Sequence, residues 1–63
     1  MDDFKSRLTN ESIQLKDKLI KLNKFMESKD AENLGRYDRE LLIMQERVMS
    51  EYHDILEERL SIL

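Results

Sequence analysis

Apolar residues recur through the first half of the chain at intervals of three, four and seven positions. This stripe consists of Phe4, Leu8, Leu15, Leu19, Leu22 and Met26. Ser12 occupies the one gap in it, and Ile13 and Ile20 add a second stripe beside it. A helix turns once every 3.6 residues, so this spacing places the side chains on one face. The pattern predicts a long helix over residues 2–29.

Two neighbouring rows of residues run through the second half of the chain. The Leu41 seam steps alternately by four and three positions and comprises Leu41, Gln45, Val48, Tyr52, Ile55, Arg59 and Ile62. The Leu42 seam repeats every seven positions and comprises Leu42, Met49, Leu56 and Leu63. Both spacings are typical of a helix, here predicted over residues 36–62. Two seams give this helix two directions in which to bury surface, one against the first helix and one against a neighbouring molecule.

The segment between the two helices gathers Ser, Asp, Asn and the sole glycine. It predicts a turn over residues 30–35, with room for a short helical piece over 30–34. Gly35 can take a positive φ at little cost, so it suits a helix end or a tight corner, and we expect Leu34 to tuck under the turn. The predicted fold is all-α, a single domain over residues 1–63 in which an antiparallel helical hairpin assembles into a homo-oligomeric bundle. The apolar C-terminal residues Ile62 and Leu63 are expected to dock.

Composition supports self-association. The chain has 63 residues, of which 40% are hydrophobic, and it contains no cysteine that could form a disulfide. A domain this small without such cross-links holds only ~3–5 kcal/mol from its own core. Two helices cannot hide this much apolar surface against each other, so a homo-oligomer is expected.

The net charge of -3 is unevenly divided. Residues 1–30 carry seven basic and six acidic side chains, whereas residues 31–63 carry four basic and eight acidic ones. This difference favours an antiparallel hairpin or pairing between chains, and the negative total argues against binding DNA or RNA polymers. The longest apolar run, residues 41–44, is far shorter than the ~20 residues of a membrane span. With no apolar leader after Met1, an intracellular protein without a membrane partner is expected.

The residue inventory offers little for catalysis or metal binding. His53 is the only histidine, and with Glu57 it supplies two ligands where a metal site needs more. We expect it to be a surface residue. The serines lack a neighbouring base and there is no glycine-rich phosphate loop. The expectation is a protein that is not an enzyme and uses no metal or cofactor.

Binding is the remaining chemistry. Phe4, Arg7, Lys18 and Lys21 lie near the edges of the apolar stripe, where a ring can stack on a base and a cation can meet a phosphate. Alternatively, Phe4 is a core residue at the helix end and the lysines form a solvated face. Gln45 and Arg59 are polar residues within a seam, which often fix register or oligomer state. Arg59 is equally suited to line an anion site where several chains meet.

Two strings of residues resemble a known family. The first is Arg7-Leu8-x-x-Glu11-x-x-Gln14-Leu15-x-x-Lys18-Leu19-x-Lys21-Leu22-x-x-Phe25-Met26. The second comprises Leu34, Glu40, Leu41, Leu42, Gln45, Met49, Tyr52, Ile55, Leu56, Arg59 and Leu60. The specificity of the resemblance depends on the joint spacing of Gln45, Met49, Tyr52 and Arg59. Over about residues 4–60 the chain resembles the phage anti-CBASS sponges and related short helical proteins of crAss-like and other tailed phages.

The resemblance implies a concrete function. Such sponges are non-enzymatic homohexamers that sequester the cyclic oligonucleotide alarm signals of bacterial CBASS immunity, in the cytoplasm of the infected host. For a cyclic dinucleotide such as cGAMP, bound between two protomers, it implies Phe4 as the stacking ring and Lys18 as the phosphate contact, with Arg7 and Lys21 beside them. Some members also hold a cyclic trinucleotide where three protomers meet, and Arg59 is the matching candidate.

The chain departs from the family pattern in three places. Only three residues precede Phe4, and a phenylalanine stands where members often carry a tyrosine or histidine. Leu34-Gly35 replaces a frequent Leu-Pro. The alternative function is a small helical protein–protein adaptor with no nucleotide ligand, in which the second seam binds a different protein.

Overall fold

The computed structural model describes residues 3–63 and contains three helices. They are α1 (Asp3–Glu27), α2 (Lys29–Glu32) and α3 (Arg36–Ser61). Every regular element within this range is a helix, which confirms the all-α class. Residue 2, where the first helix was predicted to begin, lies outside the described residues. That helix ends two positions before the predicted residue 29, and α3 ends one position before the predicted residue 62.

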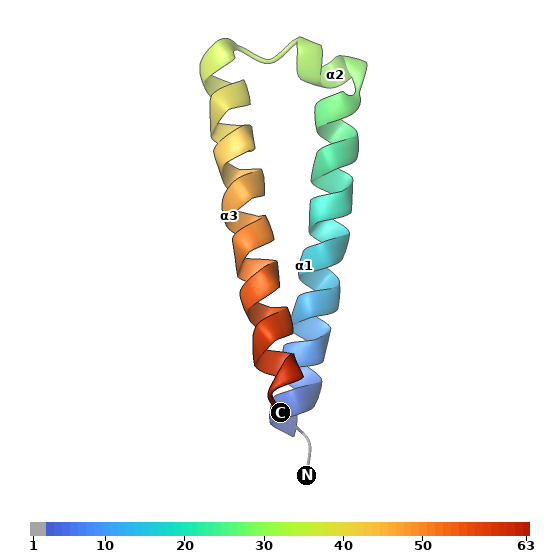
Figure 1. Cartoon of the computed structure of the whole chain (residues 1–63). Coiled ribbons are helices and arrows are strands. Elements are labelled where there is room, and N and C mark those ends of the chain that lie inside the picture. Colours follow the sequence, from blue (N-terminus) through green and yellow to red (C-terminus); the bar gives the residue numbers. More distant parts are fainter. Residues whose placement is uncertain (1–2) are drawn as a thin grey trace.

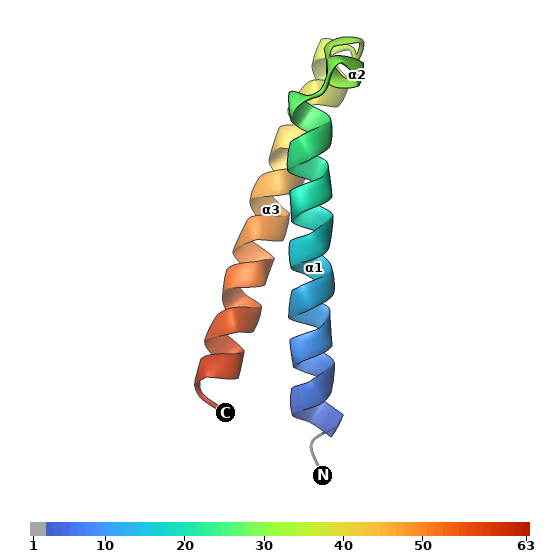
Figure 2. The same ribbon diagram turned by 90° about the vertical axis from the view of Figure 1, so that its right-hand side faces the viewer.

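The two long helices lie side by side and run in opposite directions (Figures 1 and 2). The short helix α2 lies at the turn, at the opposite end of the molecule from the C-terminus (Figure 1). The molecule is an elongated rod with extents of 48 × 15 × 13 Å. Such a shape leaves most side chains near solvent, because each helix has a single neighbour.

The contact between α1 and α3 is built by the first apolar stripe and the Leu42 seam. Leu8 and Leu56 are buried, with 5% and 0% of their surface exposed. Half-buried residues continue the contact along both helices: Leu15, Leu19, Leu22, Met26, Leu42, Met49 and Leu60. Burying a leucine side chain fully contributes about 1.5–3 kcal/mol, so few residues supply most of the stability of one chain.

The Leu41 seam lies outside this contact. Its apolar members are exposed by 41–82%: Leu41, Val48, Tyr52, Ile55 and Ile62. The prediction that the C-terminus docks is wrong for the single chain, because Ile62 and Leu63 are 82% and 57% exposed. α3 ends at Ser61, so these two residues lie beyond the helix and, among residues 3–63, remain exposed.

The turn is closed by backbone hydrogen bonds. Ser28 N–H donates to the carbonyl of Phe25 at 3.0 Å, and Leu34 N–H donates to the carbonyl of Ala31 at 3.1 Å. Ala31 is buried and Leu34 is half-buried, as expected of a side chain tucked under the turn. Gly35 does not use the positive φ that is open to glycine: its φ is -64°, and the residue caps the N-terminus of α3.

Charge does not link the two long helices of one chain by ion pairs. Both ion pairs found among residues 3–63 lie within one helix, Lys21 with Asp17 at 3.0 Å and Arg36 with Glu40 at 3.6 Å. All four side chains are largely exposed, where such pairs contribute little. Among residues 3–63, the antiparallel packing of α1 and α3 is therefore made without ion pairs between the two helices. Within residues 3–63, no helix is both long and apolar enough to cross a membrane.

Candidate ligand-binding side of the helix pair

Two contacts between side chains of α1 and α3 share one side of the molecule. The guanidinium carbon of Arg59 lies 5.7 Å from the centre of the Phe4 ring, a cation–π arrangement. The hydroxyl of Tyr52 donates a hydrogen bond to Oε2 of Glu11. Phe4 and Glu11 are seven positions apart on α1, and Tyr52 and Arg59 are seven positions apart on α3. The two contacts are therefore successive steps of one antiparallel register.

The same register predicts a third step. Seven positions beyond Glu11 is Lys18, and seven positions before Tyr52 is Gln45; both are exposed. Gln45 makes only a long contact in the single chain, from Nε2 to Sδ of Met49 at 3.7 Å. We call the resulting set the cross-helix ladder. Its two observed contacts are Phe4 with Arg59 and Glu11 with Tyr52, and its expected third step is Lys18 with Gln45.

The ladder brings together two residues that the family resemblance assigns to different ligands, Phe4 for a dinucleotide and Arg59 for a trinucleotide. It does not bring Phe4 close to Lys18. These two residues are 14 positions apart, which corresponds to about 21 Å along α1. A base stacked on Phe4 and a phosphate held by Lys18 of the same chain are too far apart for adjoining groups of one small ligand.

The other two candidates on α1 are engaged with their own helix. Arg7 Nε donates to the backbone carbonyl of Asp3 at 3.3 Å. Lys21 forms the ion pair with Asp17, and 75% of its side chain is exposed. Both contacts are local and exposed to solvent. Either side chain can therefore leave its present partner and bind an anion at little cost in free energy.

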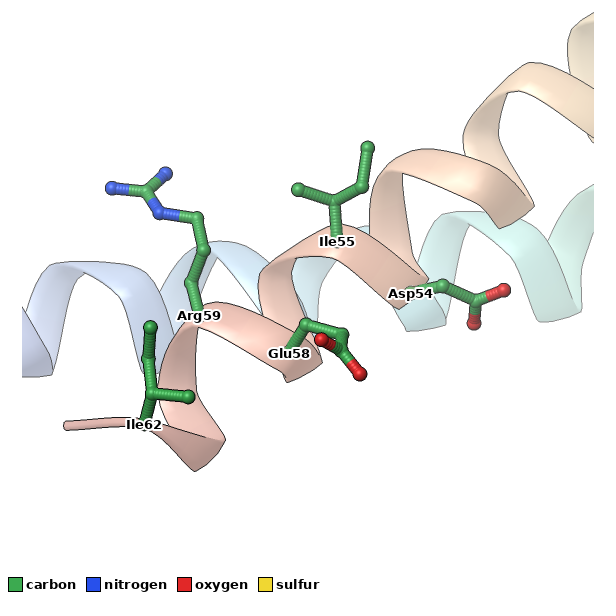
Figure 3. A pocket seen from close by; sticks show the side chains of 5 residues that line it. All are labelled: Asp54, Ile55, Glu58, Arg59 and Ile62. Atoms are coloured by element: carbon green, nitrogen blue, oxygen red, sulfur yellow. The ribbon is translucent and has the colours of Figure 1, made fainter.

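A hollow of about 380 Å³ lies beside Arg59 on α3 (Figure 3). Its lining consists of Asp54, Ile55, Glu58, Arg59 and Ile62. In Figure 3 the side chains of Arg59 and Ile55 extend from the same side of the ribbon, whereas the carboxylates of Asp54 and Glu58 lie on the other. All of this lining comes from α3 and its C-terminal cap residue Ile62, so the hollow is open and needs a second surface to close it.

A second hollow of about 330 Å³ continues along the acidic edge of α3. It is lined by Asp54, Glu57, Glu58 and Ser61. Three carboxylates repel the phosphates of a nucleotide, which favours the Arg59 edge for an anion. Of the two hollows, only the first offers a cation beside apolar surface.

The environment of Tyr52 keeps its hydroxyl protonated. The hydrogen bond to Glu11 raises the pKa of Tyr52 above the usual value of 10.0, with smaller contributions from burial and from the Glu11 charge. The positive charge of Arg59 opposes this shift and lowers the pKa. Tyr52 is therefore a neutral hydrogen-bond donor at physiological pH, which holds the Glu11 carboxylate at a fixed position.

Two further polar residues are shielded from solvent. Ser12, the gap in the apolar stripe, is 4% exposed and donates to Oε2 of Glu57 at 2.6 Å. His53 was expected on the surface next to Glu57, but it is half-buried. No group of three or more potential metal ligands occurs among residues 3–63. The gap in the stripe was the signal for Ser12, whereas the pairing of Glu11 with Tyr52 depends on a register that neither string shows alone.

The fold and the ladder together define a class: a small all-α chain of two antiparallel helices, with aromatic, cationic and hydrogen-bonding groups displayed along one exposed side. Residues 2–62 match the family model of Sequestin, and the chain belongs to the Sequestin family. The family name indicates the sequestration of a ligand. No curated protein and no solved structure matches the chain.

Proposed function

We propose that this chain is a non-enzymatic sponge that sequesters cyclic di- and trinucleotide immune signals and so inhibits CBASS-type anti-phage defence. It acts in the cytoplasm of the infected bacterial host. Membership of the Sequestin family over residues 2–62 is the observation that carries the proposal. The ligand class comes from the resemblance of the chain to the anti-CBASS sponges.

The chemistry of the first ladder step suits a nucleotide. The Phe4 ring is 52% exposed and offers a face on which a base can stack. The Arg59 guanidinium beside it is a planar donor that can bind two oxygens of a phosphate. A ligand with two or three phosphates needs only a few such cations, so a chain of net charge -3 can bind it.

The sponge is proposed to act as a homo-oligomer, for which the resemblance implies a hexamer. The exposed Leu41 seam supplies the apolar surface for contacts between copies. The hollow beside Arg59 lacks a second wall, and a neighbouring copy can provide it. A pocket between two antiparallel copies also lets Phe4 of one copy and Lys18 of another approach the same ligand, although they are about 21 Å apart along one helix.

Calorimetric titration with cGAMP and with a cyclic triadenylate tests the proposal. Submicromolar affinity, about -8 kcal/mol or better, is expected for at least one of them. Phe4→Ala and Lys18→Ala are expected to weaken dinucleotide binding at least tenfold, because each removes a direct ligand contact, and Arg59→Ala to weaken trinucleotide binding. Lys24→Ala is the matched control, since this exposed lysine lies on α1 outside the ladder.

Recovery of the ligand separates a sponge from an enzyme. The bound nucleotide is expected to be released intact when the complex is denatured by heat. No binding of any cyclic di- or trinucleotide at micromolar concentration would contradict the proposal, and hydrolysed ligand in the released fraction would contradict its non-enzymatic part.

A second candidate function is a helical adaptor, which the exposure of the Leu41 seam favours. A row of apolar residues on a helix face can accept an amphipathic helix of another protein. An adaptor is expected to be a monomer or dimer by light scattering, to show no nucleotide binding and to capture a host protein. A larger assembly with bound nucleotide rejects it.

A further inference from the structure

The hydrogen bond between Ser12 and Glu57 is a polar contact at the edge of the apolar core. The Ser12 hydroxyl donates to Oε2 of Glu57 at 2.6 Å, and Ser12 is 4% exposed. Ser12 stands within the apolar stripe, where a leucine would remove more apolar surface from water. Apolar packing tolerates a small rotation of one helix on another, whereas a hydrogen bond is directional. The proposed function gives this contact no task.

A second hydrogen bond between the long helices lies one residue away on α1. Glu11, the neighbour of Ser12, accepts from the hydroxyl of Tyr52. A helix turns about 100° per residue, so Glu11 and Ser12 point in different directions from α1. By the same rule Tyr52 and Glu57 are about 140° apart on α3, with the buried Leu56 between them. The two hydrogen bonds therefore lie on either side of the core, and a rotation of α3 about its axis stretches one of them.

We propose that Ser12 and Glu57 are positioning residues of the ligand-binding side, an inference that rests on the proposed function. Their hydrogen bond fixes the rotation of α3 against α1. Glu57 and Arg59 are two positions apart, about 200° around α3, so they lie on opposite sides of this helix. A bond that holds Glu57 on one side of the helix pair therefore holds Arg59 on the other, where it contacts the Phe4 ring.

The hydrogen bonds between α1 and α3 are concentrated in the half of the rod that carries these ligand-binding candidates. Among residues 3–63, the side-chain hydrogen bonds that join the two long helices are those donated by Ser12 and Tyr52. Nearer the turn, the contact consists of half-buried apolar residues of the first stripe and the Leu42 seam. The end with Phe4 and Arg59 is thus ordered before a ligand arrives, which lowers the ordering cost of binding.

Tyrosinate absorbance tests the positioning without any ligand. In a Tyr37→Phe background, Ser12→Ala is expected to lower the raised pKa of Tyr52 toward 10.0, because a rotated α3 weakens the hydrogen bond of this hydroxyl. Glu57→Gln keeps an oxygen acceptor for Ser12 and is expected to leave this pKa unchanged. Ser6→Ala is the matched control, since Ser6 is an exposed serine of the same helix.

Calorimetry extends the same variants to the ligand. Ser12→Ala is expected to weaken binding of cGAMP or cyclic triadenylate, whichever wild type binds more tightly, by about threefold to tenfold, the range that one hydrogen bond contributes. Glu57→Ala is expected to cause a similar loss, whereas Glu57→Gln is expected to bind as wild type does. Rescue by glutamine but not by alanine assigns the effect to the hydrogen bond and not to the charge.

Unchanged ligand affinity in a Ser12→Ala protein that retains wild-type helicity and copy number would overturn the inference, and so would an unchanged Tyr52 titration. If Ser12→Ala does not fold, the two Glu57 variants decide, because equal affinities of Glu57→Ala and Glu57→Gln would overturn it. Absence of nucleotide binding by wild type overturns the sponge, whereas the Tyr52 titration still decides whether Ser12 positions α3.

Discussion

In the single chain, the Phe4 ring and the Arg59 guanidinium contact each other. Their separation of 5.7 Å is within the range of a cation–π contact, which at exposed sites contributes ~0.5–1 kcal/mol. A base that stacks on Phe4 can displace the guanidinium at this small cost and leave it free for a phosphate. The contact therefore arranges both groups for a ligand without locking them.

The titration of Tyr52 reports directly on the middle ladder step. Glu11 accepts a hydrogen bond from the Tyr52 hydroxyl, which raises the pKa of Tyr52. Glu11→Gln is expected to lower this pKa again. Because the pKa is raised in the folded state, the protonated Tyr52 contributes its full stabilisation of the fold below pH ~10. This contribution is lost as the pH rises through the raised pKa. Tyrosinate absorbance in a Tyr37→Phe background, where Tyr52 is the only tyrosine, measures the shift. Identical titration curves with and without Glu11 would contradict the contact.

At the scale of single residues, the sequence predicted candidates for ligand binding but not the side chains that these candidates contact. Phe4 and Arg59 were found because they stand at motif positions or in a seam. Glu11 and Tyr52 are also motif residues, but their contact joins positions 41 apart and requires the register of α1 against α3. The periodic spacing of seven on each helix was visible in the sequence, whereas the alignment of one helix on the other was not.

At the scale of elements, hydrophobic periodicity predicted both long helices to within two residues at their C-terminal ends. The sequence did not show which role Gly35 takes, because glycine is used at both ends of helices. The φ of -64° matches the value that a proline ring imposes, so the Leu-Gly pair can adopt the backbone of the Leu-Pro that is frequent in the sponges the chain resembles.

Because few residues form the contact between α1 and α3, the stability of the helix pair is sensitive to Leu56. This side chain is fully buried, and Leu56→Ala is expected to cost about 2–5 kcal/mol, comparable to all that so small a core provides. Ile43→Ala is the matched control, since Ile43 is 50% exposed and lies outside both seams. Denaturant unfolding followed by circular dichroism compares the two variants at equal protein concentration. A loss of similar size at Ile43 would contradict this description of the core.

At the scale of the whole molecule, the sequence predicted two apolar seams on the second helix. It did not show which seam faces the first helix. Both seams have helical spacing, and only the structure shows that the Leu42 seam faces α1 while the Leu41 seam is exposed. The polar residues Gln45 and Arg59 belong to the exposed seam. Both are exposed and therefore accessible to neighbours and ligands, and within the chain Arg59 contacts the Phe4 ring.

The exposed seam predicts how assembly can be broken. Val48 is 61% exposed at its centre, and Val48→Glu is expected to lower the copy number because contact with another copy would bury an unpaired charge. The helicity of each chain is expected to remain, since Val48 does not contribute to the contact with α1. Sedimentation velocity compares this variant with Ile43→Glu, which places the same charge outside both seams. An unchanged copy number in Val48→Glu would place the interface elsewhere.

Native mass spectrometry with a panel of cyclic di- and trinucleotides tests the central claim most directly, because it counts chains and ligands in the same particle. The account predicts an assembly of several copies, up to six, that carries intact cyclic nucleotide in a fixed ratio to its chains. A folded single chain that gains no nucleotide at micromolar concentration would contradict it.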